Sequence, residues 1–243
     1  MHLDTDAILV AVLHHGEHGA IVRTLTPYDG IQVGHVRGGR SRRLRAILMP
    51  GNIVAARYSS RGDTQLARLN VELVRSRAPL FGDPLAAAAI EWTCALTAAA
   101  LPEAQSYPAI RAGLDGMLGA IESAPRAQGW AAALVRYELL LLAELGFGLA
   151  LDHCVVTGAT EDLVAVSPRS GGAVSTAAVK GYRDRLLRLP SFLVVGGTAG
   201  WPDILDGLAI TGHFLARDIL IERRADLLAA RDRLVERLRK VTG

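Results

Sequence analysis

The first 78 residues alternate between hydrophobic and polar positions with the short period that is typical of β-strands. Near the end of this region, for example, Leu69, Val71 and Leu73 share one face of a segment whose intervening residues are polar. Five strands are predicted, at residues 7–13, 20–25, 31–37, 53–58 and 66–74. Turn-forming residues separate them, as in the run from Pro27 to Gly30, where proline fixes φ and glycine can adopt a positive φ.

A short segment with helical potential, Ser41 to Met49, falls between the third and fourth predicted strands. Five short strands with a helical insert after the third are typical of the OB-fold, a barrel that often binds single-stranded nucleic acid. The order of elements therefore favours an OB-fold, and other small barrels also fit this pattern.

After Pro84 the hydrophobic positions follow a helical period. Leu134, Tyr137 and Leu141 recur at helical spacing, and Gly146 is a helix stop signal. Predicted helices cover residues 85–101, 108–121, 130–145, 174–187, 202–220 and 223–240, whereas 151–175 contains short β-like pieces. The fold class is thus α+β. We predict an OB-fold domain at residues 1–78 and a mainly helical domain at 79–243, with a small β-hairpin insert at 151–175.

Composition narrows the class of protein. Half of the 243 residues are hydrophobic and 21% are charged, as in a globular protein. No uncharged hydrophobic run reaches about 18 residues, and no basic segment precedes a hydrophobic one near the N-terminus, so we expect a cytoplasmic protein with no membrane contact. Cys94 and Cys154 lie far apart in the chain, which predicts two free thiols.

The net charge of +3 is unevenly distributed. Residues 1–78 contain 11 Arg, no Lys and 6 acidic residues, so they carry +5, whereas the remaining residues carry −2. A basic N-terminal region indicates an anionic partner, most commonly nucleic acid. Arg outnumbers Lys by 25 to 2 in the whole chain, so a compositional bias explains the choice of arginine but not its clustering.

The strongest cluster runs from Arg37 to Arg45. It places five arginines within nine residues, interrupted by Gly38 and Gly39, and few acidic residues are close in sequence. Guanidinium groups bind phosphate oxygens in a two-pronged geometry, and glycines let the backbone approach a phosphate. An arginine-rich loop exposed to solvent is the alternative interpretation. The predicted DNA-binding residues are Arg37, Arg40, Arg42, Arg43, Arg45, Arg57 and Arg61.

Candidate catalytic features are weak. The chain contains neither a P-loop motif nor a G-x-S-x-G nucleophile motif. The glycine-rich run from Gly196 to Gly200 is predicted to be a linker, with a phosphate cradle as the alternative. His14, His15 and His18 are expected around a hairpin turn. No catalytic residue, cofactor or metal is predicted, and the protein is predicted not to be an enzyme.

Several segments, in order along nearly the whole chain, resemble the RecO family of bacterial recombination mediators. They are Thr26-Pro27-Tyr28-Asp29-Gly30, Arg37-Gly38-Gly39-Arg40, Leu48-Met49-Pro50-Gly51, Tyr137-Glu138-Leu139-Leu140, Leu151 to Gly158, Val166 to Ser175, and Leu189-Pro190. The resemblance implies a protein that binds single- and double-stranded DNA and anneals complementary strands. It also implies contact with RecR and with the C-terminal tail of the single-stranded-DNA-binding protein SSB, promotion of RecA loading, and association with the nucleoid.

One segment departs from the family pattern. Many RecO proteins carry two C-x-x-C pairs that bind zinc, and here only Cys154 remains, because Thr157, Ser175 and Ala178 occupy the other positions. One thiolate cannot form a tetrahedral structural zinc site, so no zinc is predicted. For the SSB tail, Arg111, Arg126 and Arg136 are considered as contributors to a basic pocket, without being assigned to a site.

Two other functions stay open from the residues alone. The first is a metal-dependent nuclease or hydrolase that uses Asp152, His153 and a distant acid. The second is a barrel that binds protein, with the arginines incidental. A DNA-binding mediator that acts without turnover is favoured over both.

Overall fold

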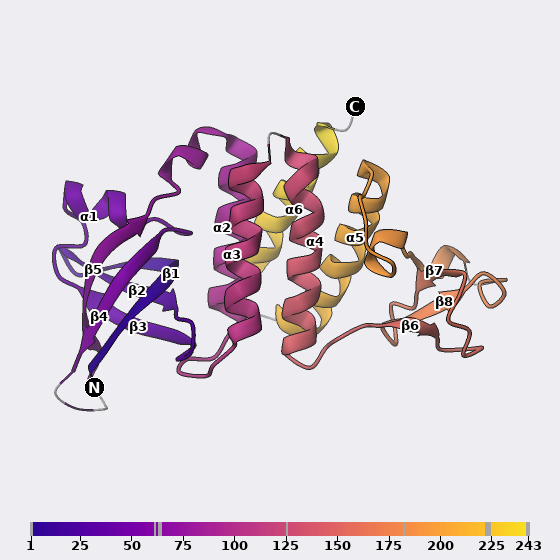
Figure 1. Ribbon diagram of the computed structural model, residues 1–243, viewed down its shortest axis with the longest axis horizontal. Coiled ribbons are helices and arrows are strands. Elements are labelled where there is room, and N and C mark those ends of the chain that lie inside the picture. Colours follow the sequence, from indigo (N-terminus) through magenta and orange to yellow (C-terminus); the bar gives the residue numbers. More distant parts are fainter. Residues whose placement is uncertain are drawn as a thin grey trace. The chain divides into compact units, whose positions relative to one another are not determined.

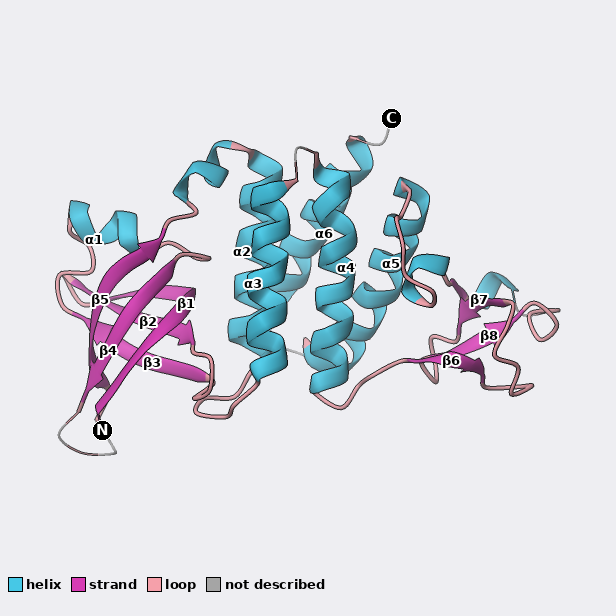
Figure 2. Cartoon of the chain, in the orientation of Figure 1, coloured by secondary structure: helices cyan, strands magenta, loops and turns pink. Residues whose placement is uncertain are grey.

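A computed structural model describes residues 2–60, 62, 65–124, 126–181, 183–221 and 225–241. The chain forms two compact units, residues 1–123 and 124–243. The first unit contains the β-barrel and two long helices, and the second contains the remaining helices and a small sheet (Figures 1 and 2). The domain limits expected from the sequence, at residue 78, stay a prediction.

The first unit begins with the five-stranded barrel that the sequence predicts. Its strands and single short helix are β1 (His2–His15), β2 (Gly19–Leu25), β3 (Ile31–Val36), α1 (Arg42–Ile47), β4 (Ile53–Ser59) and β5 (Ala67–Arg75). The strands close in the order β1-β2-β3-β5-β4, and β3 with β5 is the parallel pair. This order, with α1 between β3 and β4, is that of an OB-fold. The first strand is longer than predicted, since it starts at His2 and not at Ala7.

Hydrophobic side chains fill the barrel, and α1 supplies part of its core. Leu44 of α1 and Leu48, which directly follows α1, pack into the same cluster as Leu9, Val22 and Leu69. The core also holds one polar pair, because the hydroxyl groups of Tyr58 and Thr24 lie 2.7 Å apart and satisfy each other. Burial accordingly raises the pKa of Tyr58 to about 12, although the hydrogen bond with Thr24 opposes this shift.

A buried arginine joins the barrel to the helices of the same unit. After a 3₁₀ turn (Ala78–Gly82), α2 (Pro84–Ala100) and α3 (Pro108–Ser123) follow, and Asp83 caps α2. Arg77 is fully buried, and its guanidinium donates to the Gly51 carbonyl at 2.5 Å and to Asp115 of α3 at 3.0 Å. Because a buried cation is costly unless it is paired, these contacts fix the end of β5 against α3.

The second unit combines three helices with a four-stranded sheet. The helices are α4 (Ala127–Glu144), α5 (Trp201–Phe214), which continues as a π-helical turn (Leu215–Ile219), and α6 (Ala225–Lys240). Glu138 of α4 is fully buried and accepts hydrogen bonds from Arg231 of α6, at 2.7 and 2.9 Å, and from Thr211 of α5. This buried polar contact connects the three helices.

The sheet of the second unit is larger than the predicted hairpin. It comprises β6 (Ala150–Cys154), β7 (Leu163–Val166), β8 (Gly172–Ser175) and β9 (Leu187–Arg188), in the order β6-β8-β7-β9. The helix predicted over 174–187 is wrong. Val174 pairs with Ala165 of β7, and Gly181 adopts a φ of +85°, so the described residues of this segment form a strand, turns and a 3₁₀ turn (Arg183–Arg185). Strand pairing overrides the local helical pattern here.

Candidate nucleic-acid interface

The arginine-rich segment forms a tight turn followed by the short helix α1. Gly38 adopts a φ of +68°, which glycine tolerates best, and its carbonyl accepts a hydrogen bond from the Ser41 amide at 2.9 Å. The Ser41 hydroxyl then caps α1 by accepting from the Leu44 amide at 3.3 Å. Since Leu44 points into the barrel core, the arginines beside it in α1 point to solvent.

This segment lies against the hairpin between β1 and β2. The Arg40 amide donates to the His18 carbonyl at 3.5 Å, and the Arg40 guanidinium donates to the Glu17 carbonyl at 3.2 Å. Gly39 packs so closely on Ala20 that a Cβ at Gly39 would lie 2.7 Å from the Ala20 Cβ. Hydrogen bonds and packing therefore hold the arginines at one place on the barrel. We call residues 37–45 the arginine loop.

All five arginines of this loop are exposed, and none forms an ion pair with a carboxylate in the described part of the chain. They are Arg37, Arg40, Arg42, Arg43 and Arg45. Glu17 lies in the turn between β1 and β2, but its carboxylate lies 3.9 Å from His18 and its side chain is 93% exposed. The loop thus places five positive charges close together, where they are available to bind an anion.

The two remaining predicted arginines differ from this group. Arg61 lies outside the described residues. Arg57 is on β4, directly opposite Asp4 of β1, and its Nε donates to the Asp4 carboxylate at 3.2 Å. Arg57 is therefore already paired with an acid, unlike the arginines of the loop.

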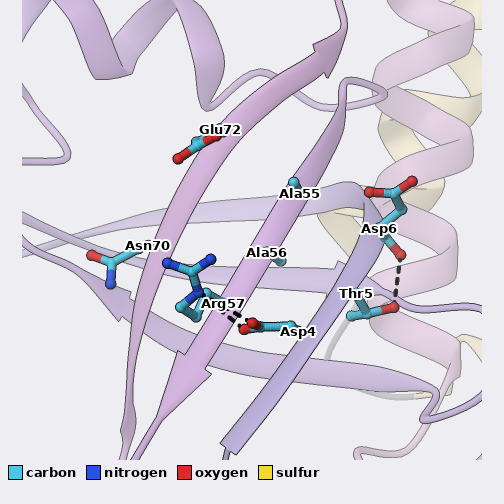
Figure 3. A pocket seen from close by; sticks show the side chains of 8 residues that line it. All are labelled: Asp4, Thr5, Asp6, Ala55, Ala56, Arg57, Asn70 and Glu72. Atoms are coloured by element: carbon cyan, nitrogen blue, oxygen red, sulfur yellow. Dashed lines mark hydrogen bonds and ion pairs between the residues drawn. The ribbon is translucent and has the colours of Figure 1, made fainter.

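Arg57 also belongs to a groove in which acids outnumber bases. The outward residues of β1, β4 and β5 form cross-strand rows, in which Asp6, Ala55 and Glu72 are neighbours. Figure 3 shows the Asp6 and Glu72 carboxylates at this groove of about 320 Å³, with Arg57 directed toward Asp4. Among the described residues, no basic group lies within 4 Å of the Asp6 or Glu72 carboxylate, although Asp6 acts electrostatically on Arg111 of α3. We call this groove the acidic groove.

Aromatic rings suited to stacking are few on the barrel surface. Tyr58 is buried in the core, and Tyr28 is 77% exposed at the turn before β3. The sequence reasoning missed His35, whose ring lies next to that of His15 with centroids 5.7 Å apart. The alternation of His35 with buried residues, near the end of a predicted strand, is a sequence signal for an outward-facing ring. Only the pairing of the strands, however, brings this ring next to His15.

The positions of the lost cysteine pairs come together in the second unit. The Cys154 thiol accepts a hydrogen bond from the Ser175 amide at 3.2 Å, and the hydroxyl groups of Thr157 and Ser175 lie 3.4 Å apart. Ala178 packs against the same cluster. Burial raises the pKa of Cys154, but hydrogen bonds from Ser175 and Thr157 outweigh it and lower the pKa to about 6. The prediction that this segment binds no zinc stays a prediction.

The pair considered for catalysis is exposed. Adjacent residues of a regular strand point to opposite faces. The side chains of Asp152 and His153 nevertheless meet at 2.9 Å, in a strand whose pairing is irregular between Ala150 and Cys154. Hydrogen bonds from its own backbone amide and from His153 lower the pKa of Asp152. Across the described residues, no group of three or more His, Cys, Asp or Glu is arranged to hold a metal ion.

A second basic region lies in the second unit, beside the glycine-rich loop before α5. Arg126, Gln128 and Arg136 line a groove of about 430 Å³ together with Gly197 and Thr198. Arg136 donates to the Gly197 carbonyl at 3.0 Å, and its guanidinium lies over the Phe192 ring at 5.4 Å.

Arg111, the third arginine considered for this pocket, is in α3 of the first unit. Its side chain is mostly buried and lies 3.9 Å from Asp115. Desolvation lowers the pKa of Arg111, although Asp115 opposes this shift. Arg111 therefore does not line the groove of the second unit.

The fold and these surfaces define a class of protein: an OB-fold barrel with an exposed basic loop, joined to a helical region that carries a small sheet. Two family models match in the same order, "Recombination protein O N terminal" over residues 1–77 and "Recombination protein O C terminal" over residues 82–226. The chain belongs to the RecO family.

Individual relatives agree with this assignment. The chain is 46% identical to the DNA repair protein RecO of Rhodospirillum centenum, over 99% of this chain and 96% of the relative. It is 44% identical to that of Phenylobacterium zucineum and 42% identical to that of Caulobacter vibrioides, each over 98% of both chains. No helix in the described residues is both long and hydrophobic enough to span a membrane.

Proposed function

We propose that this protein is a DNA-binding mediator of recombinational repair that binds single- and double-stranded DNA and anneals complementary strands. Membership of the RecO family supports a role in DNA repair. The observation that carries the DNA-binding part is the arginine loop, whose five exposed guanidinium groups have no carboxylate partner among the described residues.

The proposed contacts are with the phosphate backbone. Guanidinium groups bind phosphates without regard to base sequence, and every neutralised phosphate releases counterions. A site of this kind holds two complementary strands equally well, which is what annealing requires. We leave Arg57 out of the proposed contact set because Asp4 already neutralises it.

Salt titration tests this proposal. Binding of a labelled oligonucleotide is followed by fluorescence anisotropy between 50 and 300 mM salt, and we expect a linear fall of log K with log salt concentration. With five phosphate contacts the slope is about −3.5 for a single strand. Binding that does not respond to salt would support the alternative barrel that binds protein. Annealing of complementary strands coated with SSB is the functional readout, and failure to accelerate it would refute the mediator role.

The proposal includes protein partners: RecR, the C-terminal tail of SSB and, indirectly, RecA, at the nucleoid in the cytoplasm. For the SSB tail we propose the groove lined by Arg126 and Arg136. Its support is chemical, because an acidic tail suits two guanidinium groups beside a groove whose lining also includes Ala132 and Ala199.

Arg126→Glu tests the tail site, since Arg126 is exposed and Arg136 has structural contacts. Binding of a fluorescent SSB-tail peptide should weaken at least about tenfold, as expected for reversing one charge of a charge-assisted contact. Arg233→Glu on α6, also exposed, is the matched control. Equal binding by both variants would exclude this groove.

The proposed role needs no turnover. Asp152 and His153 form an isolated pair on an exposed strand, and no metal-binding group of three ligands accompanies them in the described residues. Incubation with Mg²⁺ and end-labelled DNA should leave the DNA intact. Cleavage that disappears in Asp152→Ala would instead establish a nuclease.

A further inference from the structure

We propose that His35, supported by His15, forms a surface on which an unpaired base of single-stranded DNA stacks, beside the arginine loop. This inference rests on the proposed DNA-binding function. In it, the arginine loop contacts phosphates and the histidine surface contacts a base. Its basis is the position of two imidazole rings on the outward face of the barrel.

Three strands create this surface. His15 of β1 pairs with Gly19 of β2, and Ile21 of β2 pairs with His35 of β3, so these residues share one face of the sheet. The imidazole rings of His15 and His35 meet edge to face, with centroids 5.7 Å apart and an angle of 80° between planes. Each ring therefore limits the movement of the other.

Gly19 allows the His35 ring to lie across the sheet. A Cβ at Gly19 would lie 2.4 Å from His35 Nε2 and 2.8 Å from the His15 carbonyl oxygen. Any side chain at this position would displace the ring. The imidazole thus lies over backbone, as a planar group needs to do if a base is to stack on it.

Apolar groups continue the surface along the sheet. Leu13 of β1 pairs with Ile21, directly across from His35, and Leu13 is 57% exposed. Histidine rings and neighbouring apolar groups are the side chains on which single-stranded bases stack. Tyr58 does not contribute to this surface, because it is buried in the core.

The arginine loop begins next to this surface. Arg37 follows His35 by two residues, is exposed, and begins the turn directly after β3 ends at Val36. Arg40 contacts the backbone of Glu17 and His18, in the turn that follows His15. A strand whose phosphates contact the loop can therefore bring a base to the imidazole. Bases of an intact duplex are stacked on one another, so the contact is specific for single strands.

The test compares single- and double-stranded DNA. His35→Ala should weaken binding of a labelled thymidine oligonucleotide about fivefold or more, the lower end for loss of one base–aromatic contact. Duplex binding should change less than twofold. His35→Phe keeps a planar ring without an ionisable group and should restore single-strand binding. His14→Ala is the matched control, since His14 neighbours His15 in β1 but alternates to the opposite side.

Three results would overturn the inference: equal losses for single and double strands in His35→Ala, no rescue by His35→Phe, or the same loss in His14→Ala. Thermal unfolding of each variant shows whether the fold is retained, and His35→Phe provides the comparison should His35→Ala unfold. Loss of binding in variants of the arginine loop but not in His35→Ala would refute this inference alone. Unchanged binding in the loop variants would remove the arginine loop from the DNA site and with it the observation that carries the proposed function.

Discussion

The arginine loop and the β4–β5 side of the same barrel contain the same residue type in different electrostatic states. In the loop, five exposed arginines have no carboxylate partner among the described residues. On the other side, Arg57 pairs with Asp4 at 3.2 Å, and Arg77 is buried against Asp115. An excess of arginine in the sequence therefore does not by itself mark a binding surface, because cross-strand and interhelical partners determine which positive charges remain available.

The pairing register of the strands explains why Arg57 is neutralised and the arginines of the loop are not. Asp4 and Arg57 are 53 residues apart in sequence, but antiparallel pairing of β1 and β4 places them directly opposite each other. The loop packs on the turn between β1 and β2, and in the described part of the chain no carboxylate pairs with its arginines. The comparison predicts that substitutions of these arginines affect different properties. Replacing the buried Arg77 should lower stability, and replacing arginines of the loop should weaken DNA binding. Replacing Arg57, whose pair with Asp4 is exposed, should change both properties little.

The largest expected effect is on stability. Arg77→Ala should lower the free energy of unfolding by about 3 kcal/mol, because it leaves a cavity and an unpaired Gly51 carbonyl. Asp115 is 40% exposed, so water compensates part of its loss. Urea denaturation of the full chain measures the change. Arg75→Ala is the control, since the partly exposed Arg75–Glu122 pair should contribute no more than about 1 kcal/mol. Equal losses in both would mean that burial of Arg77 is unimportant.

The next effect is on DNA affinity. Replacing Arg40, Arg42 and Arg43 together by Ala should weaken binding at least about tenfold and make the salt slope about 2 less steep for single strands, since three phosphate contacts are lost. The loss should be similar for different base sequences, and the unfolding curve should remain close to that of the wild type. A folded triple variant with unchanged affinity would remove this loop from the DNA site.

A smaller effect is expected at the acidic groove. If DNA is held by the loop, the carboxylates of Asp6 and Glu72 repel it from the β1–β4–β5 side. Asp6→Asn combined with Glu72→Gln should raise affinity about two- to threefold at low salt, and the gain should fade at 300 mM salt because of screening. Anisotropy titrations at the two salt concentrations make the measurement. Weaker binding in the variant would contradict the proposed separation of basic and acidic surfaces.

The smallest effect is predicted for Arg57. Arg57→Ala should change DNA affinity less than twofold and the free energy of unfolding by less than about 1 kcal/mol, because the pair with Asp4 is exposed to solvent. The double variant with Asp4→Asn should return affinity to the wild-type value. A loss as large as that of a single loop arginine would place Arg57 in the DNA site.

The sequence alone determined the barrel, most of the helices and the identity of the family. Alternation in β5, the turn at Pro27 to Gly30 and the arginines of residues 37–45 are local signals, since each depends on neighbours along the chain. The same locality caused the error at residues 174–187, where β8 and a turn replace the expected helix.

Only the tertiary structure decided which charges are neutralised and which rings meet. Arg231 contacts Glu138 although 93 residues separate them in the sequence. In the same way, Asp4 meets Arg57 and His15 meets His35 only after the strands pair. Ion pairs and contacts between rings act over a few ångströms. They therefore depend on distances in space, which the fold sets, and not on the number of residues between the partners.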